Sequence, residues 1–526
     1  MGSRPIAWRG GAAALQVLAL LAFLQLAVVT PAAAADAAPA APAAPPTLVE
    51  NPLGPLPVDT PEHEAYAHGH YWLFLVWNLF TLGFLWALLQ SRFASRVQGW
   101  AERLTRRPNL KVAACVALYS ATLWMVSLPL AIATGYLREK RYGFMNQDFA
   151  GWMGDRGKQF LVSLVVRMLL VTLLYLLMRR LGRAWWVPGA ALTIGCSILG
   201  IVIAPVFIDP LFNTFTPLHD QALRADILDM AHREGIPAHE VYEMDASVQS
   251  EHNNAYVTGL FHTQRIVLYD TLLKRFAPRE IRAVMGHEMG HYVLRHIWKT
   301  VAFLAPIILL GFLLVDRAAR RLIAAHPRWD IRRIEDPASL PVVALAALLY
   351  LLAVGPAIAT FSRHQESEAD RFGLEVTRDP EAMASSFIKF GRYDLSEYEA
   401  HPLIELLLFS HPSVNNRVRQ SQAWARAHPG SAQRAPETGG PARGRQSDFV
   451  SCRMRVRTPA SIRAVSCFRR GDWSRAAGRG APRWAGWRCE PGRSGARTPG
   501  SRASVRASGR GAWRGCRFAR PARFSS

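Results

Sequence analysis

Residues 159–178 read QFLVSLVVRMLLVTLLYLLM, an almost uninterrupted apolar run with one charged residue, Arg167. Its length matches the roughly 20 residues that a helix needs to cross the hydrocarbon core of a membrane. A helix with this sequence would be apolar on all sides, whereas a surface helix of a soluble protein has one polar face. The run therefore predicts a transmembrane helix.

Five similar stretches flank this run along the chain. They lie at 70–89, 112–137, 184–207, 300–315 and 341–361, and half of the 526 residues are hydrophobic. The stretch at 300–315 is short for a complete span. Together with an N-terminal apolar segment, they predict an all-α, polytopic membrane protein with six or seven transmembrane helices.

The two ends of the chain differ from this apolar core. Residues 1–35 place Arg4 and Arg9 before an apolar run and a cluster of small residues, the layout of a secretory signal or an uncleaved anchor. Residues 36–64 are rich in Ala and Pro and predict a flexible linker. Residues 428–526 are rich in Arg and Gly, and they hold most of the net charge of +23, so we expect a disordered tail. Such a tail either binds nucleic acid or anionic lipid or is an incidental extension, the interpretation that we favour.

The long mixed segment between the fourth and fifth spans contains His-Glu-Met-Gly-His at 287–291. The surrounding pattern, APREIRAVMGHEMGHYVLRH, is helical, so His287 and His291 share one face and can bind a single zinc ion. Glu288 follows the first histidine and can take a proton from a zinc-bound water. The motif predicts a zinc peptidase.

The residues before this motif predict further elements of a small soluble domain. We expect a helix at 219–235 and a β-hairpin at 254–270, where NNAYVTGL and RIVLYDTLL alternate well enough to be paired strands. The edge of such a hairpin can bind an extended peptide through its main chain, or it can serve only in packing. The sequence leaves both interpretations open.

A catalytic zinc site of this kind takes three protein ligands and keeps a fourth position for water. The sequence SRHQESEADRFGLEV at 362–376 offers Glu366 as the third ligand. Asp370 shares its helix face, where it either holds a ligand histidine or donates a proton to the leaving group. Glu368 is the rival ligand, but on a helix it points about 200° away from Glu366. We expect one Zn²⁺ per chain.

Several motifs occur in a fixed order along the chain. They are REKRYGF (138–144), APVFIDPLFNTFTPL (204–218), NNAYVTGLFHTQRIVLYDTLL (253–273), MGHEMGH (285–291), SRHQESEAD (362–370) and SHPSVNNRV (410–418). In these motifs the chain resembles, over residues 65–427, the type I CAAX prenyl endopeptidases, a family of integral-membrane zinc proteases. The resemblance implies a ring of membrane helices around a large chamber, with zinc at its wall. It also implies endoproteolysis near the C-terminus of prenylated Cys-aliphatic-aliphatic-x proteins.

The resemblance extends to individual residues. By similarity His287, His291 and Glu366 are the zinc ligands, Glu288 is the general base and Asp370 is a proton donor. This assignment keeps the zinc site and its base within the membrane-embedded zinc metalloprotease domain at 65–427.

Three further residues match positions near the metal or the substrate. His411 and Arg417 match a His-Pro segment of the family and are expected to steady the oxyanion or the substrate. Asn254 matches the strand residue that faces the substrate. Ser413 stands where the family often has a second proline, and the first membrane span of the family is not clearly matched.

The expected partners are peptide or protein substrates, with or without a lipid group, and membrane lipids. We expect no nucleic acid to bind the protease domain. The expected location is a bacterial inner membrane, or an endoplasmic-reticulum-type membrane in a eukaryote. Arginine-rich loops place the zinc segment outside the cytoplasm, whereas the eukaryotic family members resemble the opposite arrangement, so the orientation stays open.

Three alternative functions remain. A membrane-protein quality-control protease would share the zinc chemistry and cut misfolded membrane proteins. A non-catalytic binding or scaffold protein belongs to another class and is disfavoured because every zinc-site residue is present. A transporter would account for Arg167 within a span, but the sequence lacks inverted hydropathy repeats.

Overall fold

The structure is a computed structural model that describes residues 47–259 and 264–429. These residues belong to one compact unit of the chain, and the second unit, Glu437–Ser526, lies outside them. The expected signal-like segment at 1–35, the first part of the 36–64 linker and almost all of the 428–526 tail also lie outside the described residues.

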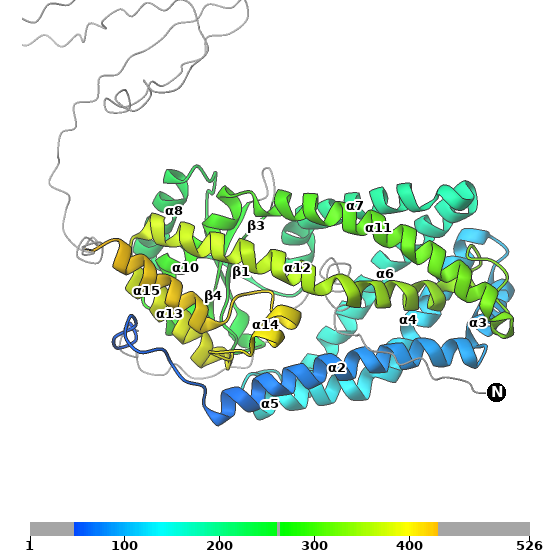
Figure 1. The fold of residues 1–526 in the computed structure, drawn as a ribbon, viewed down its shortest axis with the longest axis horizontal. Helices are drawn as coiled ribbons and strands as arrows, with labels where there is room; N and C mark the ends of the chain where they lie inside the picture. The colour runs from blue at the N-terminus through cyan, green and yellow to red at the C-terminus, as the bar shows by residue number, and fades with distance from the viewer. Residues whose placement is uncertain (1–46, 260–263, 430–526) are drawn as a thin grey trace, which may run out of the picture. The chain divides into compact units, whose positions relative to one another are not determined.

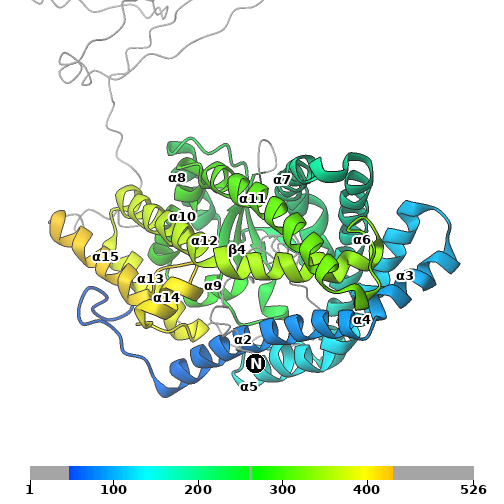
Figure 2. The ribbon, with the colours of Figure 1, turned by 45° about the vertical axis from the view of Figure 1, so that its right-hand side comes forward.

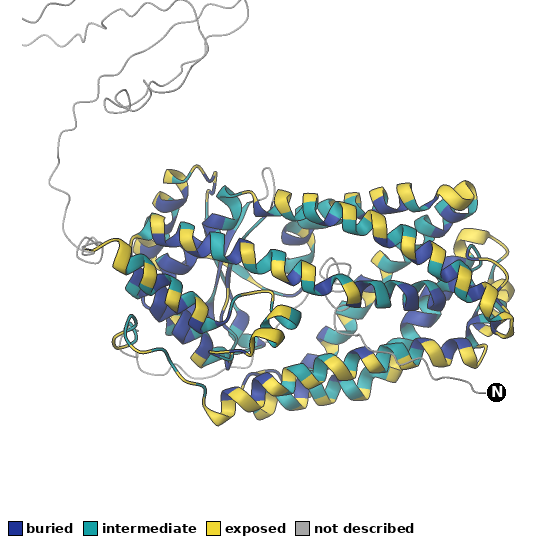
Figure 3. Cartoon of the chain, viewed as in Figure 1, coloured by how far each residue is buried: buried dark blue, intermediate teal, exposed yellow. Residues whose placement is uncertain are grey.

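Among the residues that the structure describes, six helices are long and apolar enough to cross a membrane (Figure 1). They are α2 (Pro61–Gln90), α4 (Pro108–Ile132), α6 (Phe149–Leu181), α7 (Trp186–Ile203), α11 (His296–Ala325) and α12 (Leu340–Thr377). In the most apolar part of α6, α7 and α11 only 11% of the residues are buried inside the protein. Their outer faces are therefore exposed and apolar (Figure 3). Lipid is the solvent that suits such faces, and the predicted polytopic membrane fold is confirmed.

Shorter elements connect these helices and build a separate layer. The shorter helices are α3 (Phe93–Leu104), α5 (Arg138–Arg141), α8 (Gln221–Arg233), α9 (Asp270–Arg275), α10 (Pro278–Val293), α13 (Pro380–Asp394), α14 (Pro402–Leu408) and α15 (Val414–Ala427). The strands are β1 (Phe215–Pro217), β2 (Val241–Met244), β3 (Ala255–Thr258) and β4 (Arg265–Tyr269). Helix α8 confirms the expected helix at 219–235.

The four strands form one sheet in the order β1-β2-β4-β3. Strands β3 and β4 are antiparallel, with Ala255 opposite Leu268, which confirms the expected hairpin. The sequence did not indicate β1 and β2, and β2 runs parallel to β4, with Val241 opposite Ile266. In the described sheet β3 is an edge strand, so no other strand pairs with one side of its main chain.

Helices α8, α10, α13 and α15 gather around the sheet at one end of this unit, while the apolar helices extend away from it (Figures 1 and 2). Met285 and Met289 of α10 are fully buried with Ile266 and Leu268 of β4 in one core cluster. Each such side chain contributes about 1.5–3 kcal/mol when it is fully buried. The methionine face thus fixes α10 on the sheet, and His287 and His291 lie elsewhere on its circumference.

The segment from Thr47 to α2 differs from the flexible linker that its composition predicts. Its apolar side chains pack against the core of α10, α13 and α15; they are Leu48, Val49, Leu53 and Leu56. Lys389 donates to the Thr47 carbonyl at 2.8 Å, and the Val49 amide donates to Ser385 Oγ at 2.7 Å. The prediction of a flexible linker was wrong for these residues. Composition rich in Ala and Pro does not show that four apolar side chains, scattered along the segment, pack against the protein core. The central chamber implied by the resemblance stays a prediction.

Candidate metal centre

Two helices carry the predicted zinc site, and glycines let them approach closely. A Cβ atom on Gly290 of α10 would lie 3.2 Å from Ala369 Cα of α12. A Cβ atom on Gly373 of α12 would lie 2.9 Å from the backbone nitrogen of His287. Because Gly290 and Gly373 have no side chain, the backbones of α10 and α12 come close enough for the polar residues of the two helices to contact one another.

The three predicted ligands converge at this crossing. His287 Nε2 lies 3.1 Å from His291 Nε2 and 3.3 Å from Glu366 Oε2. Glu366 Oε1 lies 3.5 Å from His291 Nε2, and one donor atom from each residue lies within 4.8 Å of the others. Glu366 Oε2 is buried and makes no hydrogen bond. The structure therefore gathers the predicted triad.

This arrangement fits a divalent cation. Two imidazole nitrogens and one carboxylate oxygen are a donor set of catalytic zinc sites, and a shared cation would satisfy the unpaired Glu366 oxygen. Burial disfavours a charge on His287, but Asp370 and Glu366 outweigh it and raise the pKa of His287 to about 10. Burial, and next the charge on His287, lower the pKa of His291 to about 3.

Asp370 holds the outer side of His287. It is fully buried, and its Oδ1 lies 2.8 Å from His287 Nδ1. Arg417 donates to both Asp370 oxygens, at 2.5 and 2.9 Å. A carboxylate on Nδ1 leaves Nε2 free to face a metal. These contacts fit the first of the two roles that the sequence left open for Asp370, which is to hold a histidine of the triad. Arg417 belongs to the same cluster through its contacts with Asp370.

His291 is held in a similar way by residues that sequence analysis missed. His296 Nδ1 lies 2.9 Å from His291 Nδ1, and His296 Nε2 lies 3.1 Å from Glu368 Oε2. Lys299 donates to the same Glu368 oxygen at 2.7 Å. Glu368, the rival ligand, thus faces His296 rather than the triad. The nearness of His296 to the motif was the only available signal, because its contact with Glu368 joins residues 72 positions apart.

Glu288 lies beside the triad, with Oε1 at 3.9 Å from His287 Nε2. Burial raises the pKa of Glu288 to about 7; protonated His287 opposes this shift, and Glu366 adds to it. The backbone of Val257 in β3 hydrogen-bonds to this carboxyl group. A cation at the triad would oppose this rise in the pKa of Glu288 and favour the ionised carboxylate, the form that acts as a base. The contact with Val257 also places the edge strand next to Glu288.

His411 and Asn254, the other residues expected near the metal or the substrate, differ in their position relative to the triad. His411 is exposed, and its Nε2 lies 3.5 Å from Glu366 Oε1. Asn254 is exposed just before β3, where its side-chain oxygen accepts a hydrogen bond from the Ala255 amide. His411 therefore belongs to the cluster, whereas Asn254 stands at the strand edge.

Comparison with known proteins gives a consistent result. Residues 217–425 match a family model described as peptidase family M48, and residues 60–214 match one described as CAAX prenyl protease N-terminal, five membrane helices. The chain is 33% identical to the uncharacterized metalloprotease YhfN of Bacillus subtilis, over 68% of this chain and 84% of that protein. It is 30% identical to the CAAX prenyl protease 1 homolog of Arabidopsis thaliana, over 56% of this chain and 69% of that protein.

A solved structure agrees with these matches. The crystal structure of S. mikatae Ste24p superposes with a TM-score of 0.62 at 25% identity, covering 70% of this chain and 91% of that chain. Its likeness spans the membrane helices as well as the sheet domain, since it covers most of both chains. The chain therefore belongs to the CAAX prenyl protease family of M48 peptidases and is an integral-membrane metallopeptidase.

Proposed function

We propose that this protein is a zinc metalloendopeptidase that hydrolyses peptide bonds near the C-terminus of protein substrates, prenylated ones included. The observation that carries the proposal is the carboxyl group of Glu288, 3.9 Å from His287 Nε2 at the meeting point of His287, His291 and Glu366. The similarity to CAAX prenyl protease 1 and its homologues supports the substrate class.

The triad would hold the ion and Glu288 would move the proton. A zinc ion held by His287, His291 and Glu366 would polarise a carbonyl and make a bound water acidic. Glu288 accepts the proton of the attacking water, and its partly buried position suits a base that works near neutral pH. Asp370 and Arg417 keep the Nε2 atom of His287 turned inward throughout.

The substrate would bind along the free edge of β3. An extended peptide can add to such an edge through main-chain hydrogen bonds, and Val257 of this strand already contacts Glu288. A peptide in that position passes the general base. Asn254, exposed at the start of the strand, is a candidate contact for its backbone.

The negative charge that develops on the carbonyl oxygen of the substrate needs a hydrogen-bond donor close to the triad. His411 is exposed, lies 3.5 Å from Glu366 and can donate from its Nε2. Glu288 is the better candidate to return a proton to the leaving amine. Asp370, the alternative donor, has both oxygens occupied by Arg417 and His287.

The test uses detergent-purified protein with a peptide that ends in Cys-aliphatic-aliphatic-x, farnesylated or unmodified, with and without a zinc chelator. We expect cleavage that the chelator abolishes. Glu288→Gln should retain bound zinc and lower kcat by about 100-fold or more, because it removes only the base. Elemental analysis of the same samples reports the metal.

Three outcomes separate the alternatives. Full activity of Glu288→Gln would refute the assignment of the base. Cleavage that persists with the chelator would refute a metal-dependent mechanism. Equal cleavage of the farnesylated and unmodified peptides would favour the quality-control protease over the prenyl-directed one.

A further inference from the structure

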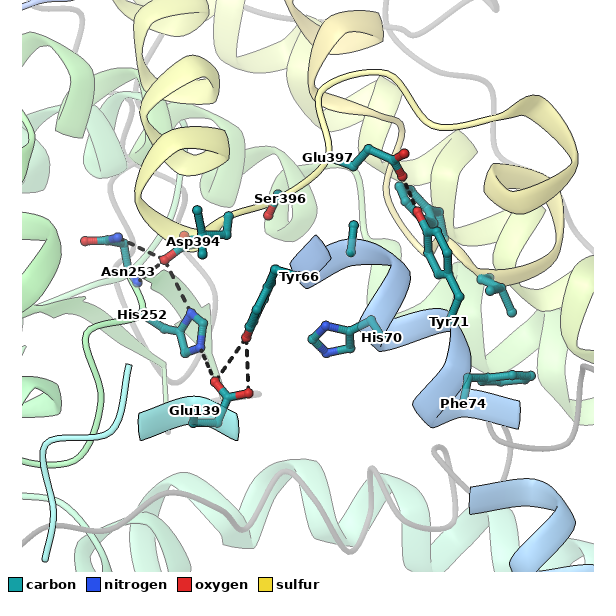
Figure 4. A pocket seen from close by; sticks show the side chains of 14 residues that line it. Tyr66, His70, Tyr71, Phe74, Glu139, His252, Asn253, Asp394, Ser396 and Glu397 are labelled. Carbon is teal, nitrogen blue, oxygen red and sulfur yellow. Dashed lines mark hydrogen bonds and ion pairs between the residues drawn. The ribbon is translucent and has the colours of Figure 1, made fainter. Parts of the chain in front are cut away.

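A concave site lies outside the metal centre. It is a cavity of about 700 Å³ between α2, α5, the segment before β3 and the chain on either side of α14 (Figure 4). Its wall combines aromatic rings, among them Tyr71, Phe74 and Phe409, with carboxylates. The carboxylates are Glu139, Asp394 and Glu397. None of the functions described above uses this cavity.

Two walls of this cavity are formed by residues that lie close in sequence to residues of the proposed catalytic site. On one side Asn253 lines it, and the next residue, Asn254, begins the approach to edge strand β3. On the other side Phe409 lines it, two residues before His411. Arg363 of α12, one turn before Glu366, donates to the Phe409 carbonyl at 2.5 Å and so ties this wall to the ligand helix. A peptide on β3 would therefore have this cavity within reach of its side chains.

The three carboxylates are not neutralised equally. Glu139 lies 2.8 Å from Arg138 and 3.4 Å from His252, and Asp394 lies 3.5 Å from His252. Glu397 instead accepts a hydrogen bond from the Tyr71 hydroxyl (Figure 4). Among the contacts of residues 47–259 and 264–429, no Lys, Arg or His forms an ion pair with Glu397. The cavity therefore retains one negative charge beside aromatic rings.

We propose that this cavity is a substrate subsite for a side chain with an apolar stem and a cationic end, lysine or arginine. Phe74, Phe409 and Leu408 can cover the methylene stem, and aromatic faces also attract a cation. Glu397 offers the charge partner that a cation needs when it leaves water. A shorter apolar side chain would fill the cavity less well, and an acidic one would meet repulsion. The proposal rests on the peptidase activity proposed above.

The experiment measures kcat/KM for matched peptides that differ at a single position. Lysine, norleucine and glutamate are placed in turn at each position within four residues of the scissile bond. At one position we expect the wild-type protein to prefer lysine over norleucine by about ten-fold, the scale on which one well-placed contact discriminates between side chains. Glutamate there should be the poorest of the three.

Two variants of Glu397 test the cause of this preference. Glu397→Gln should bring the lysine-to-norleucine ratio close to one. Glu397→Lys should reverse the ranking of lysine and glutamate, a result that loss of folding cannot produce. Glu375→Gln, a change of an exposed carboxylate near the C-terminal end of α12, is the matched control and should leave the ratio as in the wild type.

The failures of the two proposals are distinguishable. If the wild type cuts the lysine and norleucine peptides equally at every position, or if Glu397→Gln keeps the wild-type ratio, the subsite is overturned while chelator-sensitive cleavage stands. If the wild type shows no chelator-sensitive cleavage of any peptide, the peptidase proposal fails, and the subsite fails with it.

Discussion

At the scale of single residues, each of the two histidines proposed as ligands has one nitrogen turned toward the triad and one held from outside. Asp370 holds Nδ1 of His287, and His296 holds Nδ1 of His291. The proposed histidine ligands are four residues apart on one helix, which is why the sequence predicts that they lie together. His296 could not be predicted, because Arg295 adopts a left-handed conformation, with φ of 57°, that ends α10 and turns the chain back toward His291.

Removal of the contact between His296 and His291 should weaken metal binding. His296→Gln is expected to weaken zinc binding by about 10- to 100-fold, the usual effect of losing a group that orients a ligand. Glu368→Gln should act in the same direction and less strongly, because Lys299 and His296 remain in place. Competition with a chromophoric chelator measures the affinity. Wild-type affinity in a folded His296→Gln protein would contradict this role, and Glu375→Gln serves as the control.

At the scale of elements, local patterns predicted the β3–β4 hairpin but not its partners. Strand β1 has three residues and β2 has four, too few to show a period, and β2 joins β4 in parallel across a long connection. The sequence did not predict the crossing of α10 and α12 either. Gly373 looks ordinary in sequence, yet its missing side chain sets how closely the two helices approach.

Gly373→Ala should push these helices apart. The new Cβ atom would lie 2.9 Å from the His287 backbone nitrogen and 2.6 Å from Met383 Cε. The backbone cannot yield as a flexible side chain can, so we expect destabilisation of about 1–3 kcal/mol together with weaker zinc binding. Thermal unfolding in detergent and elemental analysis measure the two effects.

The control is Gly154→Ala in α6, where a Cβ atom would meet nothing within 4 Å. It should leave the melting temperature unchanged or raise it slightly, since alanine favours the helix. If Gly373→Ala melted at the wild-type temperature and kept its zinc, close packing of α10 on α12 would not be required for the site.

At the scale of the whole described unit, composition alone sufficed to predict the membrane helices, because each span needs only length and apolarity. How these helices join the sheet domain depends on tertiary contacts. His252, just before β3, lies 3.4 Å from Glu139 of α5 and 3.5 Å from Asp394 at the end of α13, and it stacks on Phe144 at 4.1 Å. One imidazole therefore links three segments that are far apart in the sequence.

This junction should make stability depend on pH. Burial disfavours a charge on His252, but the hydrogen bonds with Asp394 and Glu139 outweigh it and raise its pKa from 6.5 to about 9. A group whose pKa is raised on folding stabilises the protein fully below its unfolded pKa and loses that effect as pH rises through the folded value. The melting temperature should thus fall between pH 7 and pH 9.5.

In the variant His252→Asn, the fall over the same pH range should be smaller, because its side chain does not titrate. Thermal unfolding of both proteins in the same detergent checks this expectation. An identical pH dependence in the two proteins would show that His252 is not the titrating link.

The central claim is that His287, His291 and Glu366 jointly bind one zinc ion, and X-ray absorption at the zinc edge of the purified, active protein tests it most directly. Elemental analysis of the same sample gives the stoichiometry. We predict one zinc per chain, with nitrogen and oxygen neighbours only, at about 2.0–2.2 Å, and loss of this signal in His287→Ala. An active protein without zinc, or a shell that contains sulfur near 2.3 Å, would contradict the account.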